Sequence, residues 1–181
     1  MMFDAAYGRL ITGKDVPNSI YEVAGAKQCA VELCYLSKTA GFAGARCGYT
    51  IVPNDLTLAG VALNPMWSRR QTTKFNEVSY IVQRGAAAVF TPEGQAACRA
   101  NVEYYKNNAA AIGKALDEAG LWYSGGVNSP CLRLERPGGL SSRVFFDLLP
   151  AKGQVVGTPG AGLGAHGEGY FLLTGCGDGA R

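Results

Sequence analysis

The sequence predicts an α/β protein built from two parts, and three observations lead to this fold class. Short apolar runs that end in loops rich in small residues, at residues 2–4 and 29–36, are typical of buried strands. Apolar residues then recur at spacings of three and four from Val102 to Ala119, in the second half of one long helix predicted between residue 92 and Gly120. After Gly120 the strand-like and helical segments become shorter, which indicates a second, smaller α/β part.

The first part is predicted to contain three strands. Met2, Phe3 and Asp4 form the end of a buried strand that leads into a turn. A second strand covers residues 29–36 and enters a loop of mostly small residues at 37–48, after which residues 49–53 form a strand that ends at a proline. The order strand, long loop, strand is therefore expected here.

Two helices are predicted to follow. The first begins near Asn76 and continues to residue 90. Thr91 can cap the second helix and Pro92 can occupy its first position, while Gly120 provides a stop signal. We interpret the apolar stripe of this long helix as core packing and assign it no chemistry.

The last sixty or so residues are predicted to form strands at 131–134, 154–156 and 170–173 and a helix at 141–149. A glycine-rich loop covers residues 157–169.

Composition excludes several classes of protein. The chain has 181 residues, of which 48% are hydrophobic and 17% charged, with a net charge of +3. These values are typical of a soluble globular protein, and without a basic block or a long apolar run they predict neither a nucleic-acid partner nor a membrane span. Six cysteines without a CxxC pair and a single histidine argue against a metal site or a disulfide scaffold, and favour reduced thiols.

The loop at residues 37–48 carries the first candidate site. A lysine at the end of an apolar strand is partly withdrawn from water, which makes the neutral amine of Lys38 available as a nucleophile or base. Arg46 and Ser37 can return to the same pocket and hold a phosphate, for which a guanidinium is well shaped. The same residues are also compatible with an ordinary solvated loop.

Asp4 and Tyr7 form the second candidate site. A carboxylate at the carboxyl end of a strand projects into the crevice where α/β folds bind ligands. There it can pair with a protonated pyridine nitrogen, while Tyr7 donates to a phenolate oxygen of the same ring. The alternative is an aspartate that caps a turn beside a packed tyrosine.

Together these segments resemble a known family, the LL-diaminopimelate aminotransferases, which are fold-type I pyridoxal-phosphate enzymes of class I/II. The resemblance covers essentially the whole chain. The motif S-K-x-x-G-F-x-G-x-R at residues 37–46 is shared in looser form by many class I/II aminotransferases, whereas residues 3–7, 158–164 and 167–170 resemble this particular family. The other matching segments are residues 75–76, 91–94, 104–108 and 125–130.

The resemblance implies a role for each site residue. Lys38 would bind the aldehyde of pyridoxal 5′-phosphate and carry the proton at the substrate α-carbon, acting as the catalytic residue. Asp4 would face the ring nitrogen and Tyr7 the ring oxygen, while Ser37 and Arg46 would hold the phosphate.

Two asparagines and an organisation into domains also follow from the resemblance. Asn76 would reach the active site of a partner subunit, which implies a homodimer, and Asn128 would lie near the substrate. Residues 1–95 would be the remainder of the cofactor-binding large domain, 96–120 a connecting helix and 121–181 an incomplete small domain.

The implied reaction transfers an amino group between glutamate/2-oxoglutarate and tetrahydrodipicolinate/LL-diaminopimelate in lysine biosynthesis. The expected partners are therefore amino-acid and 2-oxo-acid substrates. The expected location of the protein is the cytoplasm or a plastid stroma. The alternatives are another class I/II aminotransferase, a pyridoxal-phosphate lyase, or a truncated remnant without activity. Because such enzymes are about twice as long, we expect these 181 residues to be a fragment that is inactive alone.

One position departs from the family pattern. Leu172 stands where the family has an arginine that grips the substrate α-carboxylate. Replacing a charge-assisted pair by an apolar side chain weakens carboxylate binding. Arg133 lies on another predicted strand and is not at the same position, so the amino-acid specificity is open.

Overall fold

A computed structural model describes residues 1–13 and 15–177 of the chain. It divides into two compact units, Met1–Val102 and Glu103–Arg181, and we describe each by itself. The expected small domain, 121–181, includes residues 178–181, which lie outside the described residues. Across the described residues no helix has the length and apolar character needed to cross a membrane.

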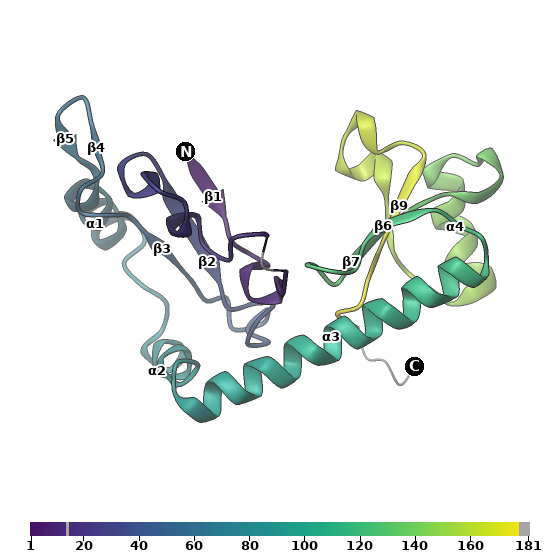
Figure 1. Ribbon diagram of the computed structural model, residues 1–181, viewed down its shortest axis with the longest axis horizontal. Coiled ribbons are helices and arrows are strands. Elements are labelled where there is room, and N and C mark those ends of the chain that lie inside the picture. Colours follow the sequence, from purple (N-terminus) through teal and green to yellow (C-terminus); the bar gives the residue numbers. More distant parts are fainter. Residues whose placement is uncertain (14, 178–181) are drawn as a thin grey trace. The chain divides into compact units, whose positions relative to one another are not determined.

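The first unit contains a three-stranded sheet of β1 (Met2–Asp4), β2 (Val31–Tyr35) and β3 (Gly48–Ile51), in the order β1-β2-β3 (Figure 1). β1 pairs with β2 in parallel and β3 pairs with β2 in antiparallel fashion. The three predicted strands are confirmed. The expectation that the first is buried is wrong, because β1 is an edge strand and Met2 is 79% exposed.

A hairpin and a helix follow that the sequence did not predict. The hairpin consists of β4 (Thr57–Leu58) and β5 (Val61–Ala62) around a turn with positive φ at Ala59 and Gly60, and α1 spans Leu63–Lys74. No residue of α1 is buried. Its sequence therefore lacks the apolar periodicity on which a helix prediction depends.

Two further helices complete the first unit, α2 (Tyr80–Ala88) and the beginning of α3 (Pro92–Glu118). The predicted cap is confirmed, since the Gly94 N–H donates to Thr91 Oγ1 at 3.1 Å. A Cβ on Gly94 would lie 2.0 Å from the carbonyl oxygen of Ala88, so only glycine allows this approach. The core here groups Leu36, Cys47, Val89 and Cys98 with apolar side chains of α2.

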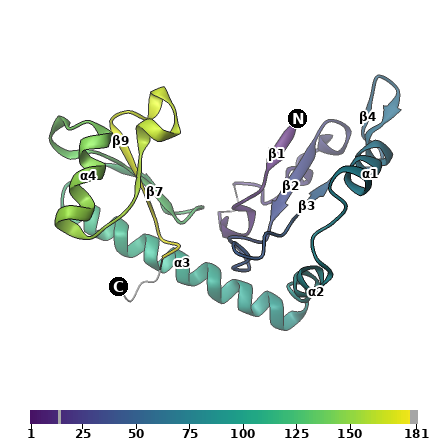
Figure 2. The ribbon, with the colours of Figure 1, turned by 180° about the vertical axis from the view of Figure 1, so that it is seen from behind.

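The second unit packs a four-stranded sheet against helices. Its strands are β6 (Tyr123–Gly125), β7 (Cys131–Glu135), β8 (Thr158–Pro159) and β9 (Tyr170–Thr174), in the antiparallel order β6-β7-β9-β8. α4 (Ser142–Gly153) contacts β8 and β9, and it is visible beside the sheet from behind in Figure 2. The predicted stop of α3 is confirmed, because Gly120 follows the helix with φ +67°.

Strand alternation gives the second sheet two different faces. One carries Leu132, Leu134 and Phe171, which are buried against Ala109 and Leu116 of α3. Phe145, Phe146 and Leu149 of α4 pack on the same cluster. The other face carries Arg133, Tyr170 and Leu172.

One predicted strand in this unit is wrong. Residues 154–156 form no strand, because Gln154 ends α4 in the left-handed region with φ +53° and turns the chain away. The strand comes later, as β8, and the predicted helix extends beyond Leu149 to Gly153.

Candidate functional site

The residues predicted to hold a cofactor belong to the first unit and lie at or near one edge of its sheet. Asp4 is the last residue of β1, and Lys38 follows the end of β2 at Tyr35 by three residues. Because β1 and β2 are parallel, with Asp4 level with Leu33, their carboxyl ends meet at the same edge. This is the edge at which open α/β sheets bind ligands.

The β2–β3 pair brings Ser37 and Arg46 to the base of one loop. The Leu36 N–H donates to the carbonyl of Cys47 at 3.2 Å, which extends the antiparallel register by one pair beyond Tyr35 and Gly48. Ser37 and Arg46 are the next residue on each side. Arg46 has φ +56°, and its Nη1 donates to the Ala43 carbonyl at 3.0 Å, so a tight turn positions the guanidinium.

The backbone of the lysine is held by a residue that the sequence analysis missed. Asn101 Nδ2, on α3, donates to the carbonyl oxygens of Lys38 and Thr39, at 3.2 Å each. A signal for it existed, because Asn101 lies one helical turn after the buried Cys98 and so on the core-facing side of α3.

Asp4 and Tyr7 occupy the turn that leaves β1. Asp4 Oδ1 accepts the Ala6 N–H at 3.1 Å, so the aspartate does cap this turn and keeps its second oxygen for another donor. Tyr7 is half-buried. This edge and its loop thus supply an amine, a carboxylate, a phenol, a hydroxyl and a guanidinium, a set that suits a phosphorylated aldehyde with a basic ring nitrogen.

The two predicted substrate asparagines are in different units. Asn76 is exposed and has φ +71° directly after α1, where its N–H donates to the Gln71 carbonyl at 2.6 Å. Its local role is to end the helix, which asparagine does with little strain. Asn128 is half-buried between β6 and β7 of the second unit.

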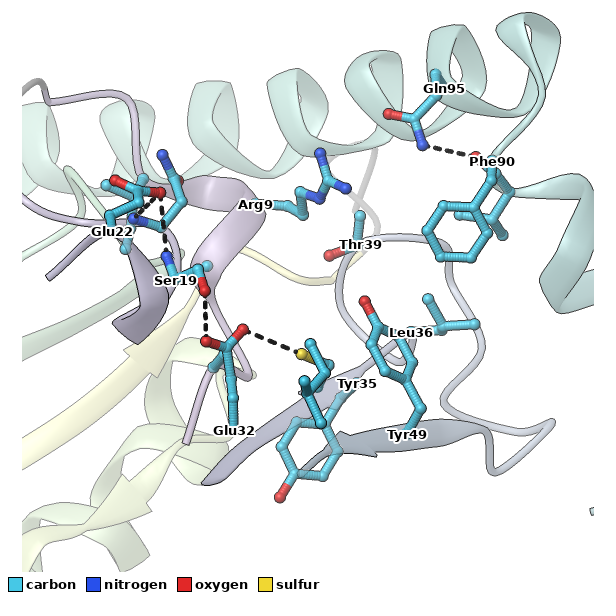
Figure 3. Close-up of a pocket in the computed structure, with 17 residues that line it drawn as sticks. Arg9, Ser19, Glu22, Glu32, Tyr35, Leu36, Thr39, Tyr49, Phe90 and Gln95 are labelled. Carbon is cyan, nitrogen blue, oxygen red and sulfur yellow. Dashed lines mark hydrogen bonds between the residues drawn. The ribbon is translucent and has the colours of Figure 1, made fainter. Parts of the chain in front are cut away.

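A cavity of about 600 Å³ lies against the face of the first sheet that carries Glu32, Cys34 and Tyr49 (Figure 3). The five residues expected to hold a cofactor are not among the described residues that line it. Glu32 is only 4% exposed, and its Oε2 accepts the Ser19 hydroxyl at 2.6 Å and the Ile20 N–H at 2.9 Å. This carboxylate therefore joins the loop after β1 to β2.

The thiol of this cavity is kept protonated. Burial raises the pKa of Cys34 to about 11, and the bond from its Sγ to Glu32 Oε1 at 3.3 Å acts in the same direction. Burial also raises the pKa of Tyr49. Neither group is ionised at neutral pH, so the cavity offers no nucleophile of this kind.

The second unit holds a fixed carboxylate next to the glycine-rich loop. Glu168 accepts the Ser142 N–H at 2.9 Å and the Ser142 hydroxyl at 2.7 Å, and Arg136 Nε lies 3.6 Å away. The hydroxyl of Ser142 is the main cause that lowers the pKa of Glu168. This network fastens the start of α4 to the segment before β9.

Comparison with known proteins identifies the family. The family model for aminotransferase class I and II matches residues 1–165. The chain belongs to this family. Within the class I and II aminotransferases, two curated relatives are both named LL-diaminopimelate aminotransferase. The one from Lawsonia intracellularis is 52% identical over 182 aligned positions, and the one from Bacteroides thetaiotaomicron is 51% identical over 183.

Solved aminotransferase structures share the fold. An L,L-diaminopimelate aminotransferase from Chlamydomonas reinhardtii matches with a TM-score of 0.91 at 38% identity, covering 98% of this chain and 44% of that one. An aromatic aminotransferase from Pyrococcus horikoshii, at 22% identity, matches with a TM-score of 0.81 and shows the fold alone. The chain spans 44–45% of the length of the two curated relatives, which in turn cover 98% of it.

Proposed function

We propose that these residues form the cofactor-binding and carboxyl-terminal part of an LL-diaminopimelate aminotransferase. The observation that carries the proposal is the identity of about half of all positions with relatives of that name. The proposed reaction moves an amino group between glutamate/2-oxoglutarate and tetrahydrodipicolinate/LL-diaminopimelate. The proposal includes a homodimer, in which Asn76 reaches the partner's site, and a cytoplasmic or plastid location that suits six free cysteines.

The donor set at the edge of the first sheet fits pyridoxal 5′-phosphate. We assign Lys38 to its aldehyde, Asp4 to the ring nitrogen and Tyr7 to the ring oxygen, and we assign Ser37 and Arg46 to the phosphate. When bound, this cofactor supplies an electron sink for the bonds at the substrate α-carbon. The chain's own contribution is the Lys38 amine, which holds and moves the proton there, on a backbone fixed by Asn101.

A labelling experiment tests the cofactor assignment. The chain is incubated with pyridoxal 5′-phosphate, reduced with borohydride and digested, and the labelled lysine peptides are quantified by mass spectrometry. We expect Lys38 to be labelled in preference to Lys114, whose side chain is 79% exposed. Arg46→Ala should reduce the label at Lys38 and leave that at Lys114 unchanged. Labelling that simply follows exposure would contradict the assignment.

Leu172 favours a second candidate, a class I/II aminotransferase with another amino-acid substrate. A leucine at this place removes the guanidinium that the family resemblance leads one to expect. The two candidates are separated by comparing LL-diaminopimelate with aromatic and aliphatic amino acids as amino donors, in a protein that joins these residues to the additional segments of a relative. Faster turnover of an apolar donor supports the second candidate.

A further inference from the structure

The strand register of the second unit places an arginine directly opposite Leu172. In the β7–β9 pair, Arg133 is the cross-strand partner of Leu172. Side chains of such a pair project from the same face, with Cβ atoms about 5 Å apart. The guanidinium that is absent at Leu172 is therefore present on the neighbouring strand, next to the same spot.

Arg133 is held over a cavity instead of extending freely into solvent. Its guanidinium carbon lies over the Tyr170 ring, 4.7 Å from the ring centre, and this cation–π contact restrains the side chain. Arg133, Tyr170 and Leu172 line a cavity of about 240 Å³, together with Leu163 and His166 of the glycine-rich loop. The leucines give this cavity an apolar wall, and the arginine and the histidine are its polar side chains other than Tyr170.

The charge of Arg133 is not compensated within the described part of the unit. Arg136 lies 3.6 Å from Glu168 and Arg143 lies 3.5 Å from Asp147, but Arg133 has no carboxylate within ion-pair distance among the described residues. Glu135 lies on the same face of β7, opposite Tyr170, and makes no ion pair with Arg133. A guanidinium held by a ring face rather than by a carboxylate keeps N–H groups that can donate to a planar anion.

We propose that Arg133 binds a substrate carboxylate in this cavity. The carboxylate accepts two N–H groups from the guanidinium, and Leu172 and Leu163 keep water from the apolar part of the ligand. That the carboxylate belongs to an amino-acid or 2-oxo-acid substrate rests on the proposed function, whereas the binding of a carboxylate to Arg133 does not. Arg133 would thus supply, from the neighbouring strand, the guanidinium that is absent at Leu172.

Titration with glutarate, a dicarboxylate without a keto group, tests the proposal in the 181-residue chain without cofactor. Binding is followed by the NMR signal of the Arg133 side-chain Nε–H, and by protection of Arg133 from phenylglyoxal. We expect saturable shifts at Arg133, and an affinity at least about tenfold lower in Arg133→Gln. Arg143→Gln is the matched control, because it removes the same charge from an exposed arginine that also lies beside an aromatic ring.

An exchange variant separates the role of the arginine from its effect on folding. Arg133→Leu combined with Leu172→Arg swaps the two side chains across the pair, and it should retain glutarate binding that Arg133→Leu alone loses. Amide exchange at Leu132 and Phe171 confirms that the core is intact in each variant. The proposal is overturned if glutarate leaves the Arg133 signal unchanged, or if Arg143→Gln weakens binding as much as Arg133→Gln.

The glutarate titration and the borohydride labelling can fail separately, so the carboxylate site at Arg133 and the cofactor assignment are tested independently. If glutarate binds at Arg133 but borohydride labelling does not select Lys38, the carboxylate site stands and the cofactor assignment fails. If labelling selects Lys38 but glutarate does not reach Arg133, the cofactor assignment stands and this inference fails.

Discussion

Glu32 shows how one buried side chain connects distant segments. Its carboxylate is satisfied by Ser19, Ile20 and Cys34, so neutralising it leaves donors without an ionised acceptor. We expect Glu32→Gln to lower the free energy of unfolding in urea by about 2–3 kcal/mol. Glu22→Gln is the control, because Glu22 is exposed and caps only a short local turn. Equal losses in the two variants would contradict the role of burial.

Glu168 gives a residue-level prediction for pH. Its bonds to Ser142 lower its pKa in the folded protein below the ordinary value of 4.5. The stabilisation is therefore complete above pH 4.5 and is lost as the pH falls through the lowered pKa. We expect the melting temperature of the native chain to exceed that of Glu168→Gln at pH 7, and this difference to shrink in acid. Glu118→Gln, in an exposed pair, should show a much smaller difference at any pH.

At the scale of elements, the junction between α2 and α3 depends on Gly94. Any side chain here meets the Ala88 carbonyl, so the two helix ends must separate. We predict that Gly94→Ala destabilises the chain by about 1–3 kcal/mol, measured by urea unfolding. Gly153→Ala is a matched control at the end of α4, where a Cβ meets nothing within 4 Å. A Gly94→Ala variant with an unchanged free energy of unfolding would show that this close approach is not required.

Elements were predictable where one face is buried. The second half of α3 carries a regular apolar pattern, because Ala109 and Leu116 face the core of the second unit. α1 and the β4–β5 hairpin were missed because no such face exists in them. The wrongly predicted strand at 154–156 contains two adjacent valines, a residue type favoured in strands, but the turn at Gln154 leaves them in an irregular segment.

The candidate site was predictable only in part for a similar reason. Asp4 ends one recognisable strand, and Ser37 and Lys38 follow another, so their place at a sheet edge could be inferred. The cross-strand pairing of Arg133 with Leu172 could not be inferred, because it depends on the register between two strands whose paired residues are 39 positions apart in the sequence. The bond from Asn101 to the lysine loop likewise joins residues 63 positions apart.

At the scale of the whole molecule, this chain is less than half as long as the curated relatives it matches, and this leads to a prediction about activity. The chain matches 44% of the length of the Lawsonia intracellularis relative. We expect the 181 residues alone to bind pyridoxal 5′-phosphate weakly and to show no measurable transamination, assayed with LL-diaminopimelate and 2-oxoglutarate. Adding the remaining segment of that relative as a separate polypeptide should restore turnover. Activity of the chain alone would contradict this expectation.

The side of β1 that faces away from β2 is the edge at which an added polypeptide can extend the first sheet. The Val31 N–H donates to the Met1 carbonyl, and the Ala5 N–H donates to the Leu33 carbonyl. Met1 and Ala5 therefore direct main-chain groups toward β2. Because alternate residues of a strand hydrogen-bond on opposite sides, Met2 and Asp4 direct theirs away from β2. A polypeptide that extends this sheet must therefore pair with Asp4 itself. Under the proposed assignment, in which Asp4 faces a ring nitrogen, pairing at this edge and orienting that carboxylate would be one assembly step, and cofactor binding would then report the association of the added polypeptide.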